Sequence, residues 1–171
     1  MYISYKCIKL GKTNWRLNWR MCTVLILNFI LATAFVVSRN NLYEVIPVLH
    51  KQWSLSVEIN PAGVIEGDWS NIVHVGLGGN VQVYGDRTPG IWFNPGNTSL
   101  AIASAINGHV GYDTDFNTDF NITINEWTKV EVSQLLKSDE FHYTISIDGI
   151  VVYDIINNKT EVFNDVKVSS S

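Results

Sequence analysis

Residues 141–153 read FHYTISIDGIVVY and contain the pattern that decides the fold. Along residues 141–147 apolar side chains alternate with polar ones, which predicts a strand with one buried face. Asp148-Gly149 joins this run to the apolar residues 150–153. A two-residue Asp-Gly link between two such runs is the strongest short-range signal for a β-hairpin, because a type I′ turn needs positive φ at both central residues.

The same alternation recurs along most of the chain. Residues 53–60 (WSLSVEIN) place four apolar side chains on one face and four polar ones on the other, and no amphipathic helix is evident after residue 38. Further strands are expected at 72–77, 81–84, 91–93, 100–106, 127–135 and 162–168. Many short strands separated by turn signals predict an all-β sandwich or barrel, with the inward-facing Trp and Phe side chains forming the layer between two sheets.

The beginning of the chain has a different composition. Residues 1–38 hold five basic residues and no acid, and residues 21–37 (MCTVLILNFILATAFVV) are almost entirely apolar. We interpret 1–38 as a basic region followed by a hydrophobic helix, 39–46 as a linker and 47–171 as one domain. The apolar run is intermediate in length between a cleaved signal peptide and a signal-anchor, so both remain open. Either one predicts a secreted protein or one on the extracellular face of the membrane, contacting lipid only through an uncleaved segment.

Charge and cysteine content narrow the class of function. Residues 39–171 hold all 16 acids and seven basic residues, a net charge of −9. Such a domain repels phosphate, so nucleic acid is not expected as a partner. Both cysteines, Cys7 and Cys22, lie in the targeting segment, which leaves the domain without thiol chemistry. The sequons at Asn97, Asn121 and Asn158 predict N-glycosylation of an exported glycoprotein.

Three stretches resemble the concanavalin A-like, laminin G-like jelly-roll family. They are residues 53–59, residues 85–93 (GDRTPGIWF) followed by 100–102, and residues 126–132 (EWTKVEV) leading to 143–152. The resemblance covers about residues 47–168 and implies a two-sheet antiparallel jelly-roll sandwich. Members of this family usually close with one more strand, which pairs near the opening strand. The chain stops at Ser171, so we expect the last strand to be lacking and the edge beside residues 53–60 to be open.

Catalysis is not expected. Glycosidases on this fold use two carboxylates close together on one strand face, and the family's Glu-x-Asp-x-x-Glu type of signature is absent. Glu58 stands alone on its strand. Glu126 and Glu131 are five residues apart, so they fall on opposite faces of a regular strand.

Residues 112–123 (YDTDFNTDFNIT) are a candidate calcium site. Oxygen-bearing side chains recur there at the spacing of the first half of a calcium loop. These are Asp113, Asp115, Asn117 and Asp119. An EF-hand is excluded, because Thr118 stands where glycine is required and Ile124 where glutamate is required. A solvated acidic strand face is the alternative. The resemblance favours calcium, since laminin G-like modules often bind it at a loop rim.

Asp86 and Arg87 are the candidate ligand-binding residues, because both lie in the Gly- and Pro-punctuated stretch 85–90. The competing interpretation is a turn in which Asp86 bonds backbone amides and Pro89-Gly90 sets the reversal. The function expected from these features is a non-catalytic extracellular binding or adhesion module that takes a glycan or matrix protein through rim loops. The alternatives are a membrane-tethered structural surface protein without a small ligand and, third, a glycoside hydrolase.

Overall fold

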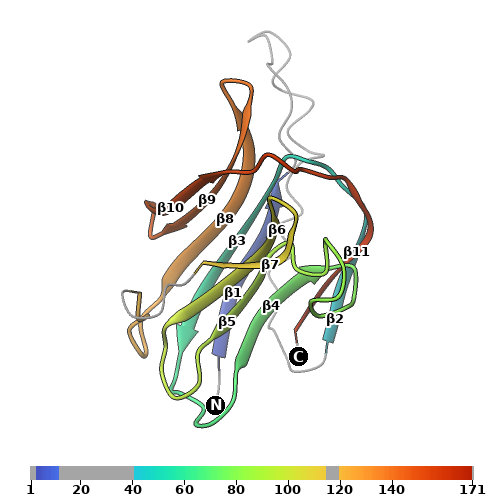
Figure 1. Cartoon of the computed structure of the whole chain (residues 1–171). Helices are drawn as coiled ribbons and strands as arrows, with labels where there is room; N and C mark the ends of the chain where they lie inside the picture. Colours follow the sequence, from blue (N-terminus) through green and yellow to red (C-terminus); the bar gives the residue numbers. More distant parts are fainter. Residues whose placement is uncertain (1–2, 12–40, 115–119, 171) are drawn as a thin grey trace, which may run out of the picture.

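The computed structural model describes residues 3–11, 41–114 and 120–170, and within them the protein is all-β with no helix (Figure 1). Two antiparallel sheets have the strand orders β1-β3-β8-β9-β10 and β2-β11-β4-β5-β6-β7. The strands are β1 (Ile3–Gly11), β2 (Asn41–Leu49), β3 (Trp53–Pro61), β4 (Ser70–Gly76), β5 (Gly90–Phe93), β6 (Leu100–Ile106), β7 (His109–Thr114), β8 (Thr128–Lys137), β9 (Glu140–Ile147), β10 (Ile150–Ile156) and β11 (Phe163–Ser170).

The core lies between the two sheets, as a sandwich requires. Along β3 buried and half-buried residues alternate from end to end, so its predicted apolar face is confirmed. Val57 on β3 and Ile145 on β9 are fully buried in one cluster with Ile91 on β5 and Ile102 on β6. The Tyr143 hydroxyl on β9 accepts a hydrogen bond of 3.0 Å from Ser104 on β6, which links the sheets through the buried layer.

The predicted hairpin of β9 and β10 is confirmed (Figure 1). Asp148 and Gly149 have φ of 49° and 82°, the two positive values that a type I′ turn needs. The Asp148 carboxylate also accepts a hydrogen bond of 2.8 Å from the backbone N–H of Lys129 on β8. The turn is therefore tied to the neighbouring strand as well as to its own hairpin.

Gly149→Ala is expected to lower the free energy of unfolding by about 1–2 kcal/mol, since a Cβ disfavours the left-handed backbone region. A Cβ at Gly149 would meet no atom within 4 Å, so backbone conformation alone is tested. Gly63→Ala is the matched control, because Gly63 is equally open and lacks the positive φ. Urea unfolding of both variants measures the difference, and equal stabilities would contradict the expectation.

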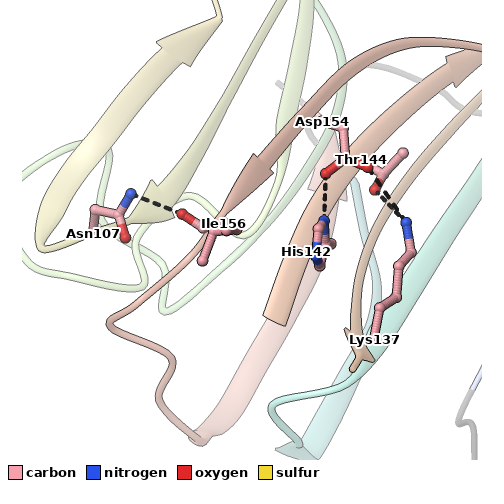
Figure 2. Close-up of polar contacts among 6 residues, drawn as sticks. All are labelled: Asn107, Lys137, His142, Thr144, Asp154 and Ile156. Carbon is pink, nitrogen blue, oxygen red and sulfur yellow. Dashed lines mark hydrogen bonds and ion pairs between the residues drawn. The ribbon is translucent and has the colours of Figure 1, made fainter. Parts of the chain in front are cut away.

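Polar side chains also join the sheets at one end of the sandwich. The Asn107 side chain donates to the Ile156 carbonyl at 3.1 Å (Figure 2) and accepts from the N–H of Asn158 at 2.7 Å. Asn157 is buried, accepts from the Asn107 N–H at 2.9 Å and donates to Gln134 at 2.7 Å. The β6–β7 turn is thereby fixed to the end of β10.

The start of the domain differs from the sequence-based expectation. The edge of β3 is not open: β1 pairs with it on one side and β8 on the other. Strand β3 therefore obtains its second backbone partner from residues 3–11, which are interpreted from the sequence as part of the targeting segment. The partner is not a strand after Val168. Residues 41–46, expected as part of a linker, belong to β2 and pair with β11. The apolar run 21–37 and its expected helix lie outside the described residues.

The part of the chain that the structure describes holds no helix with the length and apolar character needed to span a membrane.

Candidate functional site

A β-bulge in β4 turns two polar side chains toward the same side of the six-stranded sheet. Asn71 pairs with Trp92 while Val73 pairs with Ile91, so the register shifts between them. In a regular strand residues three apart face opposite sides of the sheet, and a bulge reverses that relation. As a result, Asn71 and His74 line one cavity.

Trp92 on β5 and the small residues Ala101 and Ala103 on β6 form the floor of this cavity. Trp92 lies opposite Ala101, and Gly90 opposite Ala103. The ring of Trp92 lies across Gly90, since a Cβ built on that glycine would be 1.9 Å from the ring atom Cη2. Above the small side chains the cavity has a volume of about 530 Å³. The volume lies within the range of about 300–1,000 Å³ typical of small-molecule sites.

The loop between β4 and β5 forms one wall of the cavity and is organised by Asp86. This side chain is 1% exposed. Its carboxylate accepts hydrogen bonds of 2.8 and 2.9 Å from the backbone N–H groups of Gln82 and Val83. Because these N–H groups donate to Asp86, they are not free to pair with a neighbouring strand, and residues 81–84 form bends and turns. The strand predicted at 81–84 is therefore wrong. The interpretation of Asp86 as a turn residue that bonds backbone amides is confirmed.

Arg87 reaches into the cavity from the same loop. Its guanidinium lies 4.7 Å from the centre of the Trp92 ring, a cation–π distance. Its Nη2 donates to the Asn80 side-chain oxygen at 2.6 Å. The Nε is buried and has no hydrogen-bond partner within the part of the chain that the structure describes. The guanidinium is therefore held between a ring and a neutral amide.

His74 lies behind the same ring, at 5.9 Å between ring centres. Burial lowers the pKa of His74, and the hydrogen bond to the Asp86 carbonyl only partly opposes this effect. At neutral pH the imidazole is accordingly uncharged. Its Nε2 lies 2.5 Å from the Asp86 carbonyl oxygen, to which the neutral ring donates, so Nδ1 is left as an acceptor.

The predicted ligand-binding pair is divided by the structure. Arg87 lines the cavity, while the Asp86 carboxylate is turned into the loop. Of the candidate calcium ligands, Asp113 lies on β7 opposite Ala103 and lines the cavity from the far side. Asp115, Asn117 and Asp119 lie outside the described residues. Among the residues that the structure does describe, no three His, Cys, Asp or Glu side chains gather as a metal site would need.

The three sequon asparagines Asn97, Asn121 and Asn158 are all exposed. Asn97 and Asn121 lie near one another, because Ser99 forms an isolated bridge with Asn121. Asn158 follows β10, at the end of the sandwich where the Asn107 contacts lie. All three side chains are thus accessible to a glycosylating enzyme.

A second polar cluster lies on the outer face of the other sheet (Figure 2). Asp154 contacts His142 Nδ1 at 2.7 Å and Lys137 Nζ at 3.4 Å. Burial alone would raise the pKa of Asp154, but the hydrogen bond with His142 and the Lys137 charge outweigh it, so the pKa is lowered. The three side chains are exposed or half-exposed. We interpret the cluster as a surface ion pair, a class that contributes little to stability.

Sequence reasoning missed Trp92, His74 and Asn71. Only the inward-facing Trp and Phe side chains were expected between the sheets, as Trp53 is, and Trp92 was assigned to neither face. Alternation along β5 contained the signal, because Trp92 falls on the opposite face from the buried Ile91 and Phe93. His74 and Asn71 gave no such signal, since regular alternation places them on different faces and only the bulge joins them.

Comparisons of the chain with protein-family models, with curated proteins and with solved structures found no match.

Proposed function

We propose that this protein is an extracellular glycan-binding module, a laminin G-like jelly roll that holds a sugar ring against Trp92. The observation that carries the proposal is the half-buried Trp92 ring, which lies across Gly90 and lines a cavity of about 530 Å³. The binding surface is the face of β4, β5 and β6. Among the described residues, loops contribute the wall from Gly78 to Arg87 and, from the loop before β4, Trp69.

The side chains around the cavity suit a sugar. A pyranose has an apolar face of C–H groups and a periphery of hydroxyls that both donate and accept. An aromatic ring offers a flat apolar surface to the C–H face of the sugar. The hydroxyls of the sugar can bond to donors and acceptors on the amides of Asn71 and Asn80 and on the neutral His74. Trp69, 52% exposed, adds an aromatic side chain at the rim. A few polar groups around apolar surface are typical of small-molecule sites.

The carboxylates favour binding over glycoside hydrolysis. Among the described residues that line the cavity, Asp113 alone carries a carboxylate, and hydrolysis by the usual mechanism needs two. Glu131 forms an ion pair of 2.8 Å with Lys129 on β8, in the other sheet. The exposed sequon asparagines support export and glycosylation of the chain.

A glycan array tests the proposal with the folded protein and its Trp92→Ala variant. The variant is expected to lose at least about 10-fold in affinity, since a central aromatic contact typically contributes 2 kcal/mol or more. Trp127→Ala is the matched control, because Trp127 is 45% exposed, lies outside the cavity and is expected to leave affinity unchanged.

Two outcomes would overturn the proposal. If the folded wild-type protein binds no glycan, the alternative of a structural surface protein without a small ligand is favoured. If Trp92→Ala binds as tightly as the wild type, the site lies elsewhere.

A further inference from the structure

Arg87 forms no ion pair with any side chain that the structure describes. Its contacts are the Asn80 amide oxygen and the Trp92 ring, and among the described residues its buried Nε has no hydrogen-bond partner. A charge that is partly removed from water gains from an anionic partner, because its desolvation is costly. A guanidinium has five N–H donors in a planar fork that fits a carboxylate or a similar anion. Both the spare donors and the unpaired charge point to an anionic group on the ligand.

A second cation adjoins the same wall. A Cβ built on Gly78, which lines the cavity, would lie 2.7 Å from the Lys167 ammonium. The nearby Asp86 carboxylate already accepts two backbone N–H groups. On the far side Asp113 supplies one negative charge. At the Arg87 wall two cations, Arg87 and Lys167, stand against two carboxylates, Asp86 and Asp113, so the local charge is balanced, whereas residues 39–171 as a whole carry a net charge of −9.

We propose that the ligand is a glycan with a single acidic sugar residue, whose anionic group bonds to the Arg87 guanidinium while its ring packs on Trp92. This inference rests on the proposed function and specifies the class of its ligand. The guanidinium lies 4.7 Å from the centre of the Trp92 ring, so one sugar residue that packs against the part of the ring not covered by Arg87 can contact both side chains. The anionic group is a carboxylate or a sulfate ester, both of which accept from the fork.

The surrounding charge limits how acidic the ligand is. Beyond about 8 Å the influence of Arg87 and Lys167 is screened at physiological salt. A densely sulfated polymer would extend past this distance over a strongly acidic surface, where repulsion opposes its binding. We therefore expect an isolated acidic sugar in an otherwise neutral chain to bind, and a polysulfated chain to bind more weakly.

Titration calorimetry with four ligands tests this inference on the whole protein. They are a neutral oligosaccharide, the same oligosaccharide with one carboxylate sugar, the same with one sulfate ester, and heparin. At least one singly acidic form is expected to bind 10-fold or more tightly than the neutral parent. The form that binds more tightly shows whether the anionic group is a carboxylate or a sulfate ester. This preference is expected to shrink as salt rises, because charges are screened.

Arg87→Gln is expected to abolish the preference, so that the variant binds the neutral and the singly acidic forms with affinities within about 2-fold of each other. Arg87→Lys, which keeps the charge and loses the fork, is expected to retain only part of the preference. Lys129→Gln on the other sheet makes the same change of net charge away from the cavity and is expected to leave the preference intact. The wild-type salt dependence provides a readout independent of how well any variant folds.

The outcomes separate the inference from the function on which it rests. Equal wild-type affinity for neutral and singly acidic ligands overturns the ligand class and leaves glycan binding standing. Heparin binding tighter than any singly acidic ligand also overturns it. If none of the four ligands binds and the array is negative as well, the proposed function fails too.

Discussion

Replacing Asp86 by alanine is expected to lower the free energy of unfolding by about 3 kcal/mol, and the melting temperature by roughly 6–12 °C. The carboxylate is 1% exposed and accepts from two backbone N–H groups. A hydrogen bond to a charged group contributes about 1.5–3 kcal/mol, and a buried donor left without a partner costs a similar amount. Alanine removes both bonds and offers no acceptor in their place.

The same substitution is expected to weaken glycan binding, because Gly78 and Asn80 line the cavity from the loop that Asp86 organises. Asp154→Ala is the matched control: it removes an aspartate of the exposed cluster with Lys137 and is expected to cost within about 1 kcal/mol. Thermal unfolding followed by circular dichroism compares the two variants. Equal losses of stability would show that the Asp86 carboxylate does not hold the loop as its contacts indicate.

The features that sequence predicted well depend on local pattern. Alternation along residues 53–60 placed the buried face of β3, and the Asp-Gly pair placed the β9–β10 turn with its two positive φ values. Both follow from residues that are neighbours in the chain. The turn role of Asp86 was also local, because its bonds reach only three and four residues back.

The features that sequence missed depend on distant residues. The neighbour of β3 is β1, about fifty residues away, and nothing in residues 53–61 indicates which segment pairs with its edge. The cavity joins β4, β5, β6 and β7 with the β4–β5 loop, and it needs the bulge between Asn71 and Val73. Apolar alternation cannot reveal a bulge, because one inserted residue reverses the face of every side chain after it.

Gly90→Ala is expected to weaken glycan binding by at least about 10-fold, although the variant keeps every polar group of the cavity. The new Cβ would lie 1.9 Å from Cη2 and 2.5 Å from Cζ3 of Trp92, so the ring must move. The ring is the far end of a side chain and can rotate, so we expect a stability cost of only about 1–3 kcal/mol, typical of overpacking. The displaced ring would also leave Arg87 and His74, which a change in tryptophan fluorescence would register.

A double-mutant cycle decides whether Gly90 acts through the tryptophan. If Gly90→Ala weakens binding because it displaces the ring, adding it to Trp92→Ala should change the affinity no further, giving a coupling energy nearly equal to the single-mutant effect. Additive losses would mean instead that Gly90→Ala weakens binding by a route other than the Trp92 ring. Non-additivity would show that this glycine is required because the Trp92 ring occupies the space above it, which is the geometry on which the proposed sugar site depends.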